Sequence, residues 1–594
     1  MQTLYKSYFF IIILSLISFS CELDDTVPQN GPLPDSVFNT TADLDQFFGQ
    51  EVTRSFFGEV VDTDHHPIIG ALIEIGDQQV RTDSNGIFSL RDVPTHEKFS
   101  YLKASALGYV TSGRSLRPSE GVNRVKIMLF SDFSNITIQS GEEAQVTLPN
   151  GASILFSGAY IDANGNPYTG EVKVIANYLD PLDPDINAMM PGMLYGQDVQ
   201  GDEAALETYG MISVELRGGG EKLNIDPNSP AEITFPVPPS IRNSAPGIIP
   251  LWSFDEDAGY WIEEGNAVFN GASYIAQVTH FSFWNCDAPF RVVDFCIRLT
   301  NENGNPITNI TVILSSSNSS ETRQGVTDEN GEVCGKVPAG FSLDLSVKDH
   351  CENIIYENSI GPFNQDTTID VMIPLEVDDN NIFSLAGTVL NCNQELVTNG
   401  YMKMYLEDET QYIPISNGMI QEVILNCSFL NIFSYEIIDV DALSSSGVLS
   451  ETITLPITDI GTVQACTPSQ EFISYTISGE ELIYIPFNID ASIDQTSGGY
   501  NIFGSITGHN DFYFISSGQE LGTYTFSFLG NLGPMEVYLE NLEVNLSEPN
   551  TLVFELTAFG EVGEYIDLQF SGEYINTDGE LKSVVGEVQV IRDN

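Results

Sequence analysis

Apolar and polar residues alternate along most of the chain. The alternating runs are about five to eight residues long and turn residues separate them, as in Leu482-Ile483-Tyr484-Ile485 and Tyr565-Ile566-Asp567-Leu568-Gln569-Phe570. A period of two places successive side chains on opposite faces, which is typical of half-buried strands. Only residues 202–207 have the pattern of a short helix. The pattern therefore predicts an all-β protein built from tandem β-sandwich domains.

One unit recurs along the chain and is marked by an Asn-Gly turn. Asn85-Gly86 follows Thr82-Asp83, and Asn330-Gly331 follows Thr327-Asp328. A fainter copy contains Asn417-Gly418. Asn-Gly between alternating runs favours a hairpin, because a type I′ turn needs positive φ at both central positions. We expect three related sandwiches, named here the first copy (51–130), the second copy (291–375) and the third copy (376–466).

The first copy also resembles a known module. Its residues Gly58-Glu59-Val60-Val61-Asp62, Thr82-Asp83-Ser84-Asn85-Gly86 and Gly108-Tyr109 are similar to the carboxypeptidase regulatory-like domain, a seven-stranded sandwich of the transthyretin type. The resemblance covers about residues 52–130 and extends less closely to the second and third copies. In metallocarboxypeptidases this module is an accessory without catalytic residues. The resemblance thus implies a spacer or binding module and no hydrolase.

All three tryptophans lie in residues 131–290, named here the tryptophan unit. The segments Leu251-Trp252-Ser253-Phe254-Asp255, Tyr260-Trp261 and Val278 to Asn285 resemble ZU5/UPA-type domains and cartilage-intermediate-layer-like ectodomains. Tryptophans this close together are predicted to be core residues of paired strands. The alternative is an aromatic platform for a glycan made by Trp252, Trp261 or Trp284, because exposed aromatic rings stack on sugars.

A short motif near Trp284 suggests self-processing. His280-Phe281-Ser282 resembles the His-Phe-Ser at which some ZU5/UPA proteins and a nucleoporin domain cut their own backbone. By this resemblance, Ser282 would attack the carbonyl of Phe281 while His280 assists proton transfer, and the ester would then hydrolyse. The alternative is a plain inner strand with Phe281 and Phe283 on one face.

The amino-terminal residues resemble a bacterial lipoprotein signal peptide. Lys6 precedes an apolar run from Tyr8 to Ile17, and Ser20 precedes Cys21. The run is too short to span a bilayer comfortably. The resemblance implies cleavage after residue 20, lipid on Cys21 and a polar tether over residues 21–50. The acidic stretch after Cys21 resembles the export tail of Bacteroidota surface lipoproteins, so we expect an outer-membrane protein anchored by lipid at the cell surface.

Charge excludes one class of partner and leaves one cofactor open. The chain has 22 Lys and Arg against 83 Asp and Glu, a formal charge of −61. Nucleic-acid binding as a main role is excluded because it needs clustered bases. No cofactor is predicted, and calcium is the alternative because it prefers oxygen ligands. The candidate ligands are Asp62 and Asp64, and Asp180, Asp183 and Asp185.

The cysteines predict disulfides. With lipid on Cys21, seven of the eight cysteines remain, so at least one stays free or pairs with another molecule. An exported compartment permits disulfides, and the absence of a C-x-x-C pair disfavours zinc. The candidates are Cys286, Cys296, Cys334, Cys351, Cys392, Cys427 and Cys466.

The sequence contains no familiar catalytic signature. H-E-x-x-H, the phosphate loop, the G-x-S-x-G elbow and the dinucleotide fingerprint are all missing, and the six histidines are scattered. We therefore expect a non-catalytic surface protein that binds a glycan or a protein, with residues 467–594 (the C-terminal unit) forming a further sandwich or jelly roll. The alternatives are self-processing between Phe281 and Ser282, and a carbohydrate-active or other hydrolase with a dispersed site.

Overall fold

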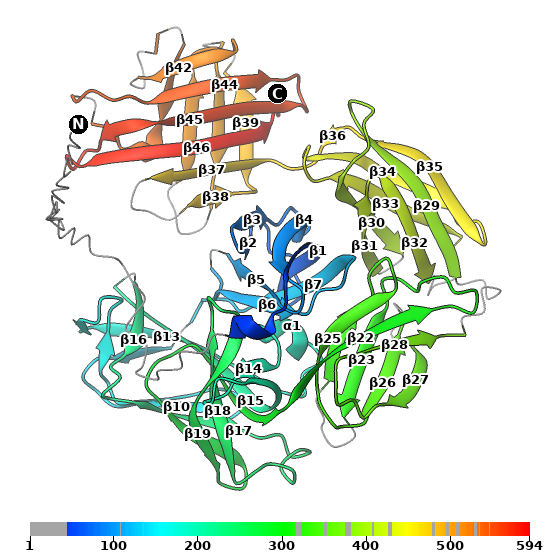
Figure 1. Ribbon diagram of the computed structural model, residues 1–594. Coiled ribbons are helices and arrows are strands. Elements are labelled where there is room, and N and C mark those ends of the chain that lie inside the picture. The colour runs from blue at the N-terminus through cyan, green and yellow to red at the C-terminus, as the bar shows by residue number, and fades with distance from the viewer. Residues whose placement is uncertain are drawn as a thin grey trace, which may run out of the picture.

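The computed structural model describes residues 44–594, except 107, 135, 220, 317–321, 350–352, 375–381, 407–408, 426–430, 478–481, 495–497, 507–510, 528–531, 534 and 546. Cys21 with its signal peptide, Cys351 and Cys427 lie outside the described residues. Nearly all regular elements of the described chain are strands, after a 3-10 helix η1 (Leu44–Phe47) (Figure 1). This confirms the prediction of an all-β fold of tandem β-sandwiches.

The first copy is a two-layer sandwich. Its strands are β1 (Glu51–Asp62), β2 (Leu72–Ile75), β3 (Gln78–Arg81), β4 (Ile87–His96), β5 (Ser100–Ser105), β6 (Ser112–Leu116) and β7 (Val122–Leu129). One sheet has the order β4-β1-β7 and the other β3-β2-β5-β6, with β1 and β7 parallel. Phe56 and Ile127 from the first sheet and Ile73 and Leu102 from the second are buried together. The alternation seen in the sequence places these side chains between the sheets.

The second copy repeats this topology. Its strands are β22 (Val292–Thr300), β23 (Thr311–Ser316), β24 (Thr322–Val326), β25 (Glu332–Pro338), β26 (Leu343–Lys348), β27 (Ile354–Ile360) and β28 (Thr367–Met372). The sheet orders β25-β22-β28 and β24-β23-β26-β27 match those of the first copy strand for strand. The parallel pair β1–β7 recurs as β22–β28.

The third copy has the same order with one added link. Its strands are β29 (Ile382–Asn391), β30 (Asn399–Leu406), β31 (Glu409–Ser416), β32 (Met419–Leu425), β33 (Ile432–Asp439), β34 (Ser444–Thr452), β35 (Ile457–Ala465) and β36 (Thr467–Pro468). The orders β35-β29-β32 and β31-β30-β33-β34 are joined because Ser416 of β31 pairs with Met419 of β32.

The tryptophan unit contains one large sheet and a helical turn. Its elements are β8 (Thr137–Gln139), β9 (Ala144–Thr147), β10 (Ser153–Phe156), β11 (Tyr160–Ile161), β12 (Pro167–Tyr168), β13 (Glu171–Leu179), α1 (Ile186–Met189), β14 (Tyr195–Gln197), β15 (Glu203–Gly218), β16 (Glu221–Ile225), β17 (Ala231–Pro236), β18 (Ile248–Asp255), β19 (Tyr260–Phe269), β20 (Ser273–Val278) and β21 (Phe283–Phe290). The predicted helix over 202–207 is wrong, because residues 203–207 belong to β15 and pair with β14 and β21. Sheet pairing here overrides the local pattern.

The C-terminal unit is a second large sheet with its own core. Its elements are β37 (Phe472–Ile477), β38 (Ile483–Ile485), β39 (Ile489–Ile493), β40 (Tyr500–Gly504), β41 (Phe512–Ser516), β42 (Gly522–Phe526), β43 (Glu536–Leu539), η2 (Glu540–Leu542), β44 (Val553–Phe559), β45 (Tyr565–Ile575) and β46 (Leu581–Ile591). Phe514, Phe554 and Val588 are among its fully buried side chains.

The first copy lies at the centre of the molecule, and the other units surround it (Figure 1). Ser115 Oγ donates a hydrogen bond to the carbonyl of Gly259 in the tryptophan unit at 2.5 Å. The guanidinium of Arg81 lies 4.7 Å from the ring centroid of Tyr484 in the C-terminal unit. The second and third copies also contact it, and the space between these units holds the candidate site.

Candidate functional site: a basic cavity between the units

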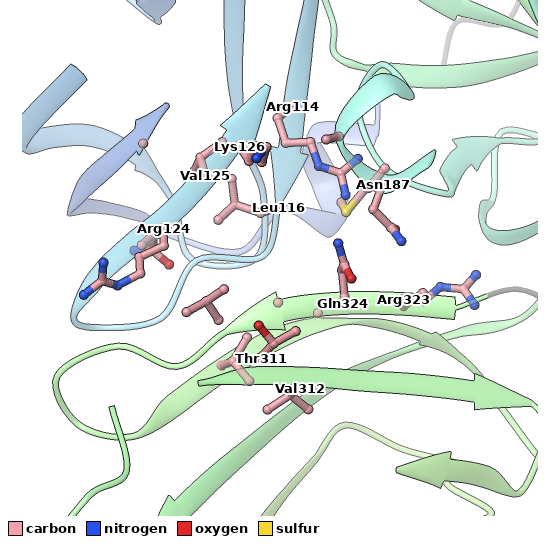
Figure 2. Close-up of a pocket in the computed structure, with 18 of the residues that line it drawn as sticks. Arg114, Leu116, Arg124, Val125, Lys126, Asn187, Thr311, Val312, Arg323 and Gln324 are labelled. Atoms are coloured by element: carbon pink, nitrogen blue, oxygen red, sulfur yellow. The ribbon is translucent and has the colours of Figure 1, made fainter. Parts of the chain in front are cut away.

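A cavity of about 700 Å³ lies where the first copy meets the tryptophan unit and the second copy. Strands β6 and β7 form one wall, and strands of the second copy form the facing wall (Figure 2). Residues 184–194, which include α1, close one end, and residues 410–412 of the third copy complete the lining. The volume lies in the range of small-molecule sites.

This cavity gathers positive charge in a strongly acidic protein. Three carboxylates line it, those of Glu59, Asp185 and Glu332, although the chain has 83 acidic residues. Seven of the chain's 22 basic residues line it, namely Arg114, Arg117, Arg124, Lys126, Arg323, Lys336 and Lys348. A cavity lined by one sign of charge concentrates its field between low-dielectric walls. The site therefore favours an anion over a cation.

Arg114, on β6, has no carboxylate partner among the described residues. Its Nη1 donates to the carbonyl of Gly192 at 2.6 Å. Burial lowers the pKa of Arg114 to about 10, and no described carboxylate raises it again. The guanidinium therefore stays protonated at neutral pH while partly removed from water. A buried charge without a counter-charge is costly.

Other bases at the cavity have carboxylate partners. Lys126 Nζ lies 3.0 Å from Glu59 within the first copy. Arg124 Nη2 lies 3.4 Å from Glu422 Oε2 of the third copy and donates through Nη1 to the carbonyl of Tyr412 at 2.9 Å. Burial raises the pKa of Glu422, although Arg124 acts in the opposite direction. The Arg124–Glu422 pair links the first and third copies, and in both pairs a carboxylate balances the positive charge of the base.

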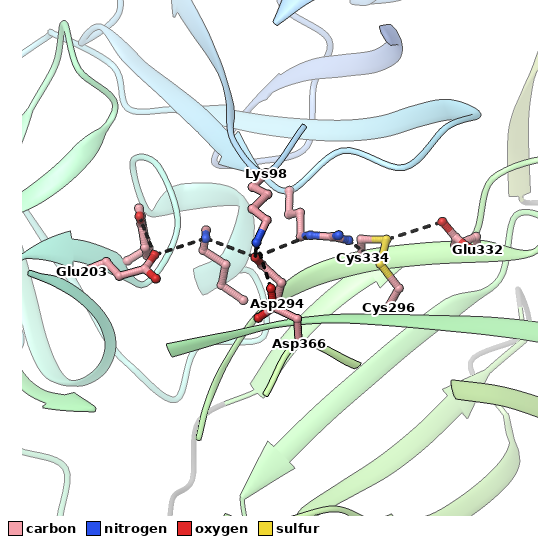
Figure 3. A network of polar contacts seen from close by, with 10 residues as sticks. Lys98, Glu203, Asp294, Cys296, Glu332, Cys334 and Asp366 are labelled. Carbon is pink, nitrogen blue, oxygen red and sulfur yellow. Dashed lines mark hydrogen bonds and ion pairs between the residues drawn. A yellow bond between two sulfur atoms is a disulfide. The ribbon is translucent and has the colours of Figure 1, made fainter. Parts of the chain in front are cut away.

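A polar network centred on Asp294 joins three units beside the cavity (Figure 3). Lys98 Nζ of the first copy lies 2.8 Å from both Asp294 and Asp366 of the second copy. Lys336, whose side chain is 2% exposed, lies 3.1 Å from Asp294 and 3.5 Å from Glu203 of the tryptophan unit. Burial would lower the pKa of Lys98, but Asp294 and Asp366 raise it above its ordinary value. Lys98 therefore stays protonated at neutral pH.

The Asn-Gly turn of the second copy docks on the first copy. Asp328 is buried, and its Oδ1 accepts the backbone N–H groups of Asn330 and Glu332 at 2.8 and 2.9 Å. Its Oδ2 accepts the hydroxyl of Ser119 at 2.8 Å and the N–H of Gly121 at 3.1 Å. One oxygen thus shapes the turn and the other holds the neighbouring unit.

The equivalent turn of the first copy docks on the third copy. Asp83 Oδ1 accepts the N–H groups of Asn85 and Ile87 at 2.8 and 3.0 Å, and Oδ2 accepts the hydroxyl of Tyr401. Lys403 Nζ donates to Asn85 Oδ1 at 2.5 Å. Burial raises the pKa of Asp83, although the hydrogen bond from Tyr401 acts against the shift.

The structure corrects the alternative that the tryptophans form a sugar-binding platform. Trp252 and Trp261 are 0% exposed and Trp284 is 1% exposed. Trp252 Nε1 donates to the carbonyl of Asp287, and Trp284 Nε1 to that of His280, both at 3.1 Å. The three rings are buried on β18, β19 and β21, so they cannot stack on a ligand in solvent.

The His280-Phe281-Ser282 motif lies in the connection between β20 and β21. His280 Nε2 lies 3.0 Å from Glu264 Oε2. Ser282 Oγ donates to the carbonyl of Phe283 at 3.0 Å, and Phe281 is buried. The imidazole therefore has an orienting carboxylate, while the hydroxyl contacts the carbonyl that follows it. Cleavage between Phe281 and Ser282 stays a prediction.

The calcium candidates serve local turns. Asp180 Oδ1 accepts the N–H of Leu182, and Asp183 Oδ1 accepts that of Asp185, both at 2.9 Å. Asp185 Oδ2 faces His65 Nε2 at 3.1 Å, and among the described residues these three aspartates do not form a group with ligand atoms within 4.8 Å of one another.

The other pair of candidates lies in a tighter cluster. Asp62, Asp64 and His66 offer ligand atoms within 4.8 Å of one another. Asp62 Oδ1 already accepts the N–H groups of Asp64 and His66 at 2.8 and 2.9 Å. Calcium binding here stays a prediction.

Two disulfides lie within the described residues. Cys296 of β22 pairs with Cys334 of β25, with Cα atoms 4.1 Å apart. Cys392 pairs with Cys466 in the third copy, with Cα atoms 5.1 Å apart. Cys286 is a buried thiol, and burial raises its pKa, so it stays protonated.

Sequence reasoning missed the cavity because its lining comes from segments far apart in the chain. A signal was nevertheless present. Nine of the 22 basic residues lie in the first copy, whereas the C-terminal unit has two, Lys582 and Arg592. With ten acidic residues of its own, the first copy is nearly neutral, and this charge sets it apart within a strongly acidic chain. It does not indicate which bases share a cavity.

Comparison with known proteins gives partial similarity. No family model matches the chain. Human cartilage intermediate layer protein 2 is 34% identical over 154 residues, which is 25% of this chain and 13% of the human protein. Cartilage intermediate layer protein 1 of Sus scrofa is 32% identical over 126 residues, or 20% of each chain. The match confirms in part the expected resemblance to cartilage-intermediate-layer-like proteins, but it spans a small share of their length.

Similarity to solved structures is weak. The shaft pilin spaA from Lactobacillus rhamnosus GG is 7% identical with a TM-score of 0.16, and covers 30% of this chain and 99% of that chain. BcpA, the major pilin subunit of Bacillus cereus, is 9% identical with a TM-score of 0.11, and covers 70% of this chain and 99% of that chain. Scores this low carry no argument about function. Within the described residues, no helix has the length and hydrophobicity needed to cross a bilayer.

Proposed function

We propose that the protein is a non-catalytic binding and structural protein, anchored by lipid to the outside of a bacterial outer membrane. The anchor is the lipid on Cys21, which follows the charged and apolar segments of a lipoprotein signal. The tether then carries the β units away from the membrane. The ligand is a glycan or a protein.

The observation that carries the binding role is the cavity at the junction of the units. Its walls come from four units, so the bound molecule would contact groups that only the assembled chain brings together. Seven bases and three carboxylates line the cavity, whereas a glycosidase depends on a pair of carboxylates that flank the scissile bond. A binding role fits this lining better than hydrolysis of a glycosidic bond.

Surface presentation is tested in cells with a Cys21→Ser variant. The wild-type chain should fractionate with the outer membrane, carry acyl mass on Cys21, and be cut by protease added to intact cells. Cys21→Ser should lose the acyl mass and leave the membrane fraction. A matched Ser20→Ala variant keeps a small residue before the cysteine and should behave as wild type. Wild-type chain without acyl mass, or protected from external protease, would refute the proposal.

Self-processing is a second proposal, favoured by the contact between His280 and Glu264. A carboxylate 3.0 Å from the imidazole can orient it and support proton transfer. A tagged wild-type chain should then give two fragments on a denaturing gel, and Ser282→Ala should give one full-length band. A single wild-type band would reject cleavage.

A further inference from the structure

We propose that the cavity between the first copy, the tryptophan unit and the second copy binds a small organic anion, whose acid group pairs with Arg114. This inference names the ligand class of the binding function proposed above and rests on that function. It does not depend on where the protein is anchored.

The first step is the state of Arg114. A guanidinium has five N–H donors, and one of its nitrogens contacts the carbonyl of Gly192. Its lowered pKa of about 10 comes from burial alone, so the group remains a cation without a described counter-charge. Elsewhere in the cavity, Lys126 and Arg124 face Glu59 and Glu422. An anion bound to Arg114 would supply the negative charge that Glu59 and Glu422 supply to Lys126 and Arg124.

The second step is the set of groups around Arg114. Arg114 and Asn187 come from one side of the cavity and Gln324 extends toward them from β24 on the other (Figure 2). Asn187 Nδ2 donates to the carbonyl of Thr322 at 3.2 Å, which fixes the amide. These neutral amides can hydrogen-bond the polar atoms of a ligand without opposing its charge. Three units thus converge on one point.

The third step is the character of the walls. Leu116 and Val125 of the first copy and Val312 of the second line the same cavity (Figure 2). Apolar walls with a few convergent polar groups are typical of sites for organic molecules rather than bare ions. The volume of about 700 Å³ admits a body of monosaccharide size with an apolar substituent.

The test uses two probes that differ in one group. Phenyl β-D-glucuronide carries a carboxylate, and phenyl β-D-glucoside is its neutral analogue. The full-length mature chain should bind the glucuronide more tightly in titration calorimetry, and the glucuronide should raise the melting temperature. Removing a hydrogen bond to a charged group costs between roughly 10-fold and 100-fold in affinity, so Arg114→Gln should weaken glucuronide binding by that factor. Binding of the glucoside should change little.

Matched variants separate binding from folding. Arg242 also donates to one backbone carbonyl, that of Val237 at 2.6 Å, but lies outside the cavity, so Arg242→Gln should bind as wild type. Arg114→Lys should retain part of the affinity. Should Arg114→Gln fail to fold, Gln324→Ala must weaken glucuronide binding instead.

Two results would overturn the inference. One is equal affinity of the wild-type chain for the glucuronide and the glucoside. The other is unchanged glucuronide binding in folded Arg114→Gln or Gln324→Ala. Either result together with correct surface localisation rejects the anion site alone, whereas loss of localisation rejects the proposed function.

Discussion

The first and second copies have the same strand order and the same Asp-containing turn, yet their turns dock on different units. Asp328 holds Ser119 and Gly121 of the first copy, whereas Asp83 holds Tyr401 of the third. In both turns one carboxylate oxygen is used locally and the other faces outward. The fold thus presents an acceptor at a fixed place, and the neighbouring surface decides what it holds.

The largest expected difference between the two copies is in the stability that the disulfide of the second copy contributes. The second copy has the Cys296–Cys334 disulfide, closing a separation of 38 residues, and the first copy has no cysteine. Replacing both cysteines by serine should lower the unfolding free energy of the second copy by about 4 kcal/mol, because the unfolded chain gains freedom. Hydrogen exchange resolved by unit should show faster exchange there and unchanged exchange within the core of the first copy. Equal loss in both copies would contradict the comparison.

Removing a docking carboxylate should have the next largest effect. Asp328→Ala deletes four hydrogen bonds from a buried group and should cost about 3 kcal/mol. Exchange should rise at residues 119–122, where the second copy docks. Asp83→Ala is the matched control and should raise exchange near Tyr401 instead. If both variants loosen the same segment, the two turns do not dock independently.

The smallest expected effect is on how stability depends on pH. The direction of this dependence differs between Asp83, at the junction with the third copy, and Asp366, at the junction of the second copy with the first. Burial raises the pKa of Asp83 above 3.8, so the folded state binds the proton more tightly than the unfolded state. Its contribution to stability therefore falls as pH rises from 3.8 through the raised pKa. Burial would also raise the pKa of Asp366, but the contact with Lys98 holds it below 3.8. Its contribution is present above pH 3.8 and is lost as pH falls through the lowered pKa.

Asparagine variants measure this difference in sign. The midpoint of denaturation should be followed against pH for wild type, Asp83→Asn and Asp366→Asn. The advantage of wild type over Asp83→Asn should shrink as pH rises above 3.8. Its advantage over Asp366→Asn should shrink as pH falls below that value. Parallel curves for all three proteins would contradict these assignments.

Local signals explain which parts of the fold could be predicted from the sequence. Alternation specifies strands, and Asn-Gly specifies turns, because each depends on a few adjacent residues. Gly86 and Gly331 have φ of +72° and +71°, but the asparagine before each does not have positive φ, and the flanking strands, β3 and β4 or β24 and β25, lie in different sheets. The predicted type I′ hairpin is therefore wrong for the first and second copies, whereas Asn417-Gly418 has positive φ at both residues and joins the paired strands β31 and β32. The short helix predicted over 202–207 is wrong because the conformation of this segment depends on pairing with β14 and β21.

The candidate site could not be predicted in the same way. Asp328 and Ser119 are separated by 209 positions in the chain, and their contact exists only once two finished sandwiches dock. The tryptophans are candidate ligand-binding residues in the sequence because they are rare and aromatic, but their side chains are buried and cannot contact a ligand. The sequence around Arg114 does not indicate a site, because Gly192 and Asn187, which lie near its side chain, come from another unit.

The central place of the first copy also sets an order of events during synthesis. Domains fold as they emerge, with the amino-terminal one first. The unit that contacts its neighbours on all sides is therefore complete before those neighbours are translated. The nine basic residues of this early unit nearly balance its ten acidic ones, so it repels the acidic units that follow far less than they repel one another. The first copy thus offers each later sandwich an already folded surface on which to dock.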